Sequence, residues 1–67
     1  MCHRDLLAAL VSNNLGYVLK LQSSYEAALE SYQQAYQVRC KLLKEDHADV
    51  VVTMNNIAEV LLAKGSL

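Results

Sequence analysis

Apolar residues recur at helical spacing in the first third of the chain. Over residues 5–21 they include Leu7, Leu10, Val11, Leu15 and Val18, which follow the i, i+3, i+4, i+7 template of an amphipathic helix. Other leucines and alanines between them widen the apolar arc beyond a single face. A helix with so wide an arc is expected to have neighbours on two sides.

A second helix is predicted over residues 24–44, where apolar and polar side chains separate onto two faces. Tyr25, Ala28, Tyr32 and Ala35 lie at helical spacing on one face, and mainly glutamate, glutamine and lysine side chains lie on the other. The third helix is predicted over residues 47–64. It contains a run of four β-branched residues, 50–53, which alone would favour a strand, but a helical start before it and a helical pattern after it favour helix.

The polar residues between these stretches predict where the helices begin and end. Ser23 with Glu26 three residues later has the form of a capping box, and Ser24 is an alternative N-cap for the second helix. Asp46 is a suitable N-cap for the third helix. Gly65 follows a lysine and is the expected C-terminal stop.

Three helices joined by short turns pack as antiparallel neighbours, so the predicted fold is all-α: one helical hairpin plus one further helix, within a single domain. The chain has 67 residues, of which 54% are hydrophobic. A chain this short gives only a small core. We therefore expect it to form a homo-oligomer, a dimer in the simplest case, or to belong to a longer repeat array.

Charge and hydropathy narrow the classes of partner. Six Lys/Arg against seven Asp/Glu give a net charge of -1 with no run of one sign, which disfavours nucleic acid. The longest uncharged stretch, Leu6 to Leu19, is shorter than the roughly 18 to 20 apolar residues of a membrane span. No cleavage pattern follows that stretch and Asp5 precedes it, so no signal peptide is expected and the predicted location is cytoplasmic.

Few residues offer chemistry. Cys2, His3, Cys40 and His47 are the soft or imidazole ligands, but their spacing is not that of a structural zinc site, and the two cysteines are expected to be reduced thiols. Cys40, His47 and Asp49 could approach one another across a turn, yet no glycine-rich loop or enclosed pocket is expected beside them. We predict no catalytic residue, no metal and no cofactor.

A short phrase occurs twice. Asn13-Asn14-Leu15-Gly16 returns as Asn55-Asn56-Ile57-Ala58, 42 positions later, in the first and third predicted helices. Repetition at such a period is typical of helical repeat proteins, in which each unit buries its apolar face on the next unit. Arrays of this kind usually bind partners.

The chain resembles the tetratricopeptide repeat, whose pattern places a leucine and a small residue in helix A and an aromatic at the start of helix B. The positions that match, in order, are Leu15, Gly16, Tyr25, Ala28, Tyr32 and Ala35. The small residues let two helices of a hairpin cross closely, and the tyrosines fill gaps between hairpins. The 42-residue period is similar to the kinesin light chain type of repeat, although that subtype has proline and glycine where this chain has Ala48 and Lys44.

The resemblance implies about one and a half repeats of a right-handed α-solenoid, with the A helices lining a groove for an extended peptide. It places in that groove Asn13, Asn14, Tyr17, Lys20, Asn55, Asn56, Glu59 and Leu62. Asparagine amides both donate to and accept from a peptide backbone. Alternatively, Asn14 and Asn56 only hydrogen-bond between hairpins. The predicted function is a non-catalytic scaffold or adaptor module for a protein or peptide partner; the alternative is a helical self-association unit without a peptide ligand.

Overall fold

The computed structural model describes residues 3–44 and 47–65, and of residues 3 and 4 only the backbone. It contains three α-helices, α1 (His3–Leu21), α2 (Tyr25–Leu42) and α3 (Ala48–Lys64). All three predicted helices are therefore present, and their bounds differ from the predicted ones by at most two residues. None of the described helices is long and apolar enough to cross a membrane.

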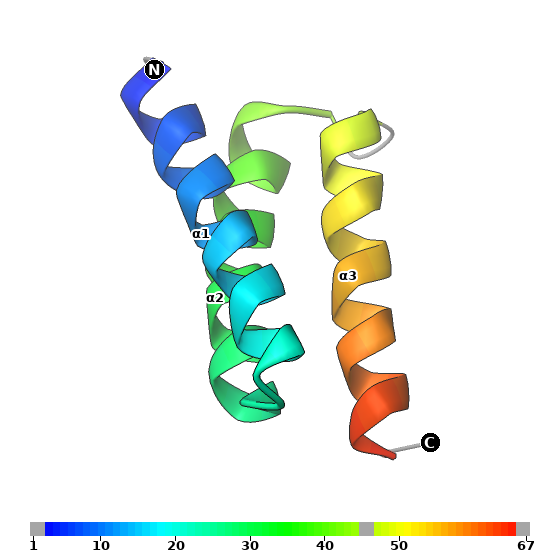
Figure 1. Ribbon diagram of the computed structural model, residues 1–67. Helices are drawn as coiled ribbons and strands as arrows, with labels where there is room; N and C mark the ends of the chain where they lie inside the picture. The colour runs from blue at the N-terminus through cyan, green and yellow to red at the C-terminus, as the bar shows by residue number, and fades with distance from the viewer. Residues whose placement is uncertain (1–2, 45–46, 66–67) are drawn as a thin grey trace.

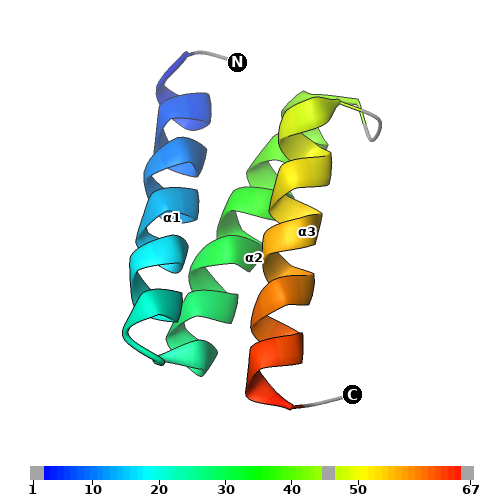
Figure 2. The same ribbon diagram turned by 45° about the vertical axis from the view of Figure 1, so that its right-hand side comes forward.

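The helices form one hairpin and a third helix beside it. Figure 1 shows α1 and α2 as antiparallel neighbours joined by a tight turn, with α3 antiparallel to α2 and therefore parallel to α1. In the turned view of Figure 2, α2 lies between α1 and α3. The molecule measures 36 × 20 × 13 Å along its principal axes, so it is an elongated layer of helices.

The turn between α1 and α2 is made by residues 22–24. Ser23 has a φ of 63°, in the left-handed region, and the Ser24 N–H donates to the carbonyl of Leu19 at 2.9 Å. Ser24 is the N-cap of α2, but its side chain makes no capping hydrogen bond. The alternative N-cap is therefore confirmed, and the capping box built on Ser23 and Glu26 is wrong because Ser23 belongs to the turn.

The start of α3 also differs from the prediction. His47 is the N-cap, with extended backbone, and its Nδ1 accepts the backbone N–H of Asp49 at 3.1 Å. The imidazole thus takes the role assigned to Asp46, which lies outside the described residues. At the other end Gly65 has a φ of 76°, the left-handed conformation that a C-terminal glycine adopts without strain, as predicted.

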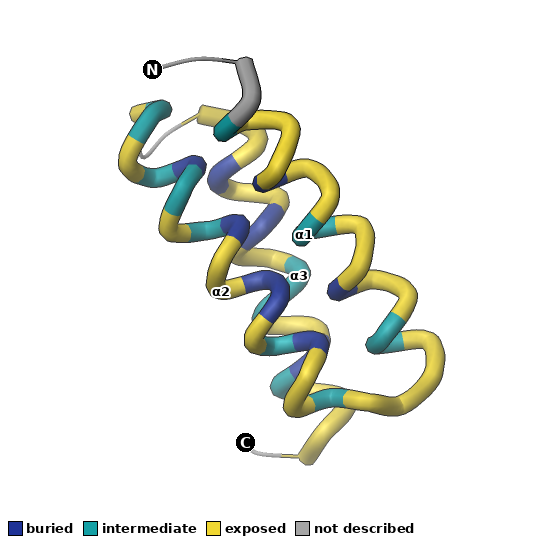
Figure 3. Tube along the Cα trace, turned by 90° about the vertical axis from the view of Figure 1, so that its left-hand side faces the viewer, coloured by how far each residue is buried: buried dark blue, intermediate teal, exposed yellow. Residues whose placement is uncertain are grey.

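The core lies along the face of α2 that meets both other helices. Its fully buried apolar side chains are Ala9, Ala28, Tyr32, Ala35, Val50 and Val60. The tube in Figure 3 shows buried positions recurring along α2 at helical intervals. In the β-branched run, Val50 and Thr53 are buried whereas Val51 and Val52 are about half exposed, which confirms helix because the burial repeats every three residues.

The helices α1 and α2 approach each other closely at Gly16. A Cβ on Gly16 of α1 would lie 2.7 Å from Cδ1 and 2.8 Å from Cε1 of Tyr32. The ring of Tyr32 therefore occupies the space that any other residue at position 16 would need. The same ring packs with Ala28 and Val60, so it joins all three helices in one core.

Candidate functional site

Side chains of α1 and α3 meet in two polar pairs on one surface of the molecule. Asn56 Nδ2 donates to Asn13 Oδ1 at 3.0 Å, and Lys20 Nζ donates to Glu59 Oε1 at 2.9 Å. These four residues belong to the predicted groove set, and the two parallel helices bring them together across 43 and 39 residues of sequence. We call the surface that they form the α1–α3 face.

The other predicted residues lie around these pairs. Tyr17 is 52% exposed, and the Lys20 amine lies 5.8 Å from the centre of its ring, within the range of a cation–π contact. Asn55 is exposed and precedes Glu59 by four residues, which places both on one side of α3. Leu62, three residues beyond Glu59, is also exposed.

Asn14 is exposed, and Asn56 hydrogen-bonds to Asn13 instead of to Asn14. Of the alternative that Asn14 and Asn56 hydrogen-bond between hairpins, the structure therefore shows the bond of Asn56 to the first repeat unit.

Beneath the Lys20–Glu59 pair lies the phenol of Tyr32. Its hydroxyl is buried and makes no hydrogen bond to any residue that the structure describes. Burial raises the pKa of Tyr32 above its ordinary value, an effect that the nearby Lys20 charge partly offsets. The hydrogen bond to Glu59 raises the pKa of Lys20. Both shifts keep these groups in their protonated forms, so at neutral pH the α1–α3 face has a lysine cation above a neutral phenol.

The raised pKa values predict a loss of stability in alkali. Unfolded tyrosine ionises near 10.0, so above that pH the unfolded chain loses its phenol protons first and gains stability relative to the folded state. The contribution of Tyr32 is therefore complete below pH 10.0 and is lost as pH rises through its folded-state pKa; Lys20 acts in the same direction. Urea unfolding from neutral to strongly alkaline pH should show a smaller loss in Tyr32→Phe than in the parent chain. Equal losses of stability in the two proteins would contradict the role of Tyr32 ionisation.

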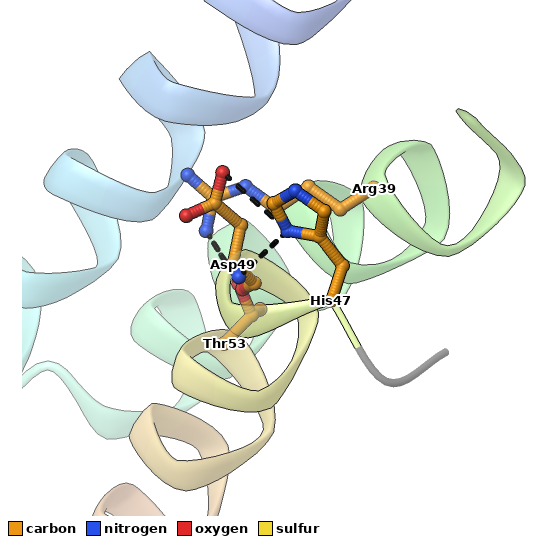
Figure 4. Close-up of polar contacts among 4 residues, drawn as sticks. All are labelled: Arg39, His47, Asp49 and Thr53. Carbon is orange, nitrogen blue, oxygen red and sulfur yellow. Dashed lines mark hydrogen bonds and ion pairs between the residues drawn. The ribbon is translucent and has the colours of Figure 1, made fainter. Parts of the chain in front are cut away.

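A second polar cluster lies at the start of α3 and was not found from the sequence. Arg39 of α2 is 7% exposed; its Nη1 donates to Thr53 Oγ1 at 2.7 Å and to the Asp49 carbonyl at 3.2 Å (Figure 4). No carboxylate oxygen lies within ion-pair distance of the guanidinium among the described residues. One signal was available, because Arg39 continues the buried spacing of Tyr32 and Ala35 along α2.

Arg39 also lines a cavity beside the helices. It has a volume of about 560 Å³. Its lining comes from all three helices and the segment before α3: Leu6, Leu7, Leu10, Arg39, Leu43, His47 and Asp49. The cavity is separate from the α1–α3 face, since none of its lining residues belongs to the predicted groove set. The apolar walls and single buried cation favour binding over catalysis.

The residues considered for metal or thiol chemistry are only partly described. Cys40 is a free, half-buried thiol, whereas Cys2 and the side chain of His3 lie outside the described residues. Within residues 5–44 and 47–65 no three His, Cys, Asp or Glu side chains are grouped closely enough to hold a metal ion. His47 instead caps α3, with its Nδ1 4.0 Å from the Asp49 carboxylate.

Large apolar side chains remain exposed on the outer helices. On α1 they include Leu7, Val11, Leu15 and Val18, which are 59%, 65%, 50% and 47% exposed and lie three or four residues apart on one stripe. On α3 Val51, Val52, Met54 and Leu62 are also exposed. Exposed apolar stripes of this size mark surfaces where another chain or another structural element packs.

A protein-family model described as tetratricopeptide repeat matches residues 5–67. The match includes both copies of the Asn-Asn phrase and the whole of α2 between them. No curated protein and no solved structure matches the chain.

Proposed function

Because the chain belongs to the tetratricopeptide repeat family, a non-catalytic class whose members mediate protein–protein interaction, we propose that it binds an extended peptide segment along the α1–α3 face. In this proposal α1 and α2 make one complete repeat and α3 is the first helix of the next. The likeness to the kinesin light chain subtype and a cytoplasmic location remain part of the proposal.

The observation that carries the proposal is the pairing of Asn13 with Asn56 and of Lys20 with Glu59. A partner can exchange these contacts at little cost. The exposed Lys20–Glu59 ion pair contributes only about 0 to 1 kcal/mol, and the Asn13–Asn56 hydrogen bond about 1 kcal/mol. Asn55 is exposed next to them and makes no side-chain hydrogen bond to a described residue, so its amide is available to a peptide backbone.

The test begins with selection of binding peptides from a random display library against the full chain, followed by measurement of affinity in solution. Asn55→Ala is expected to weaken binding about fivefold, the equivalent of one hydrogen bond of about 1 kcal/mol. Asn13→Ala should weaken binding as well. Gln34→Ala removes a similar amide from an exposed position on α2 and is the matched control.

Three results bear against the groove. These are failure to select any peptide, equal affinities for all three variants, and a loss caused by Gln34→Ala alone. Because Asn55 is exposed, its replacement should change the free energy of unfolding by less than about 0.5 kcal/mol, so reduced affinity would not reflect unfolding.

The exposed stripe on α1 favours a second candidate function, self-association of the helical unit. We expect the isolated chain to form a homodimer through apolar surfaces of this kind, in which case Val11→Glu should shift it to monomer in sedimentation analysis. Val11 is 65% exposed, so the glutamate is tolerated in the monomer. Gln34→Glu on α2 is the charge-matched control. A parent chain that sediments as a folded monomer at micromolar concentration rules out this candidate.

A further inference from the structure

The cavity between the start of α1, the end of α2 and the start of α3 has two chemically different sides. Leucines from α1 and Leu43 form the apolar side, and Arg39, His47 and Asp49 form the polar side. Figure 4 shows Arg39 reaching from α2 toward the start of α3, next to His47 and Asp49. A volume of about 560 Å³ lies within the range of small-molecule sites, which combine mostly apolar walls with a few polar groups.

The unusual feature of this cavity is Arg39, a buried cation whose hydrogen-bond partners among the described residues are neutral. The side chain is 7% exposed, yet its recorded partners are neutral, namely the Thr53 hydroxyl and the Asp49 carbonyl, both bound by Nη1. Buried cations are ordinarily paired with an anion. Nε and Nη2 donate to no residue in the described part of the chain, and a guanidinium presents such donors in a planar fork that matches a carboxylate.

The other ionisable groups of the cavity limit the charge that a ligand can carry. The Asp49 side chain is 59% exposed, and its carboxylate lies 4.0 Å from His47 Nδ1. Its negative charge opposes multiply charged anions near Arg39. The cavity therefore fits a ligand with one negative charge and an apolar body.

We infer that this cavity binds a small apolar monocarboxylic acid, with its carboxylate on the Arg39 guanidinium and its hydrocarbon body among Leu6, Leu7, Leu10 and Leu43. The site is independent of the α1–α3 face. The inference gives the chain a small-molecule ligand, whereas members of its family mediate protein–protein interaction.

The test uses three probes with the same hydrocarbon body: octanoate, octan-1-ol and octylammonium. Binding to the full chain is followed by NMR, on the leucine methyl signals and on the Nε–H signal of Arg39. Octanoate should give saturable shifts of both, and octan-1-ol should bind about tenfold more weakly because it lacks the charge-assisted hydrogen bonds. Octylammonium should give no saturable shift. Equal affinities for the three probes, or no saturation with octanoate, would overturn the inference.

Variants at exposed positions keep the test separate from folding. Leu7 and Leu21 are both on α1, 59% and 64% exposed, and only Leu7 lines the cavity. Leu7→Glu should reduce octanoate affinity at least tenfold, because it places a charged carboxylate against the ligand's hydrocarbon body. Leu21→Glu should leave the affinity unchanged. Equal effects of the two variants would contradict the assignment. Binding of the peptide acid acetyl-Leu-Leu without binding of octanoate would also contradict the assignment, because the ligand would then be the C-terminus of a peptide.

Discussion

Replacement of Tyr32 by alanine is expected to lower the free energy of unfolding by about 4 kcal/mol, the usual cost of removing a buried aromatic ring from a core. The ring is fully buried and contacts Ala28 and Val60, so its loss would leave a cavity where all three helices meet. A domain of this size has only about 3 to 5 kcal/mol of stability from its core. The variant should therefore be largely unfolded, as measured by circular dichroism and urea titration at a fixed chain concentration.

The control is Tyr32→Phe, which keeps the ring and removes the hydroxyl. That hydroxyl is buried without a partner among the described residues, so the folded protein gains nothing from it in exchange for its lost hydration. We expect the phenylalanine variant to be as stable as the parent chain or more stable. If it is as unstable as Tyr32→Ala, the hydroxyl has a partner and this account of the core is wrong.

Replacement of Gly16 by valine is expected to cost about 3 kcal/mol, at the upper end of the range for overpacking a core. The new Cβ would start 2.7 Å from the Tyr32 ring, and the ring cannot move because it is enclosed on every side. Relief requires α1 and α2 to separate, which opens the hairpin. Urea unfolding followed by circular dichroism measures the loss.

Ala58→Val provides the matched control because position 58 is the counterpart of position 16 in the second copy of the phrase. Ala58 is exposed, since none of the described helices packs over that side of α3. The valine should therefore change stability by less than about 0.5 kcal/mol. A large loss of unfolding free energy in Ala58→Val, or no loss in Gly16→Val, would contradict the close packing at Gly16 and the exposure of Ala58.

The helices themselves were predictable from local sequence, because each has apolar residues at helical spacing and a clear polar interruption. The family resemblance predicted Gly16 as a small residue where the two helices of the hairpin cross and Tyr32 as a side chain that fills space between hairpins. The Tyr32 ring lies against Gly16 and also packs with Val60 of α3. The N-cap of α3 was not predicted, because histidine is not among the residues that ordinarily cap a helix N-terminus, whereas aspartate is.

The contacts between the residues of the candidate site could not be predicted from the sequence. The groove residues were chosen from the family resemblance, and the structure pairs Asn13 with Asn56, which are not at equivalent positions of the two copies. Such pairing depends on the offset between α1 and α3, which α2 sets by packing against both. Arg39 was missed because a charged side chain in an otherwise polar stretch of α2 is ordinarily exposed.

The self-contacts of the α1–α3 face change what is expected of a partner. A peptide that lies along this face has to replace the Glu59 carboxylate at Lys20 and the hydrogen bond that Asn56 donates to Asn13. Segments that carry a carboxylate and an extended backbone supply both kinds of group. Selected peptides should therefore be enriched in aspartate or glutamate.

The most direct measurement of the central claim is NMR mapping of the surface that a selected peptide contacts, with the side-chain amide signals of the asparagines as reporters. The account predicts that the amides of Asn13, Asn55 and Asn56 shift in one saturable step, with the signals of Gln33 and Gln34 on α2 unchanged. Shifts confined to the glutamines of α2, or to the apolar stripe of α1 with the asparagines unaffected, would contradict it.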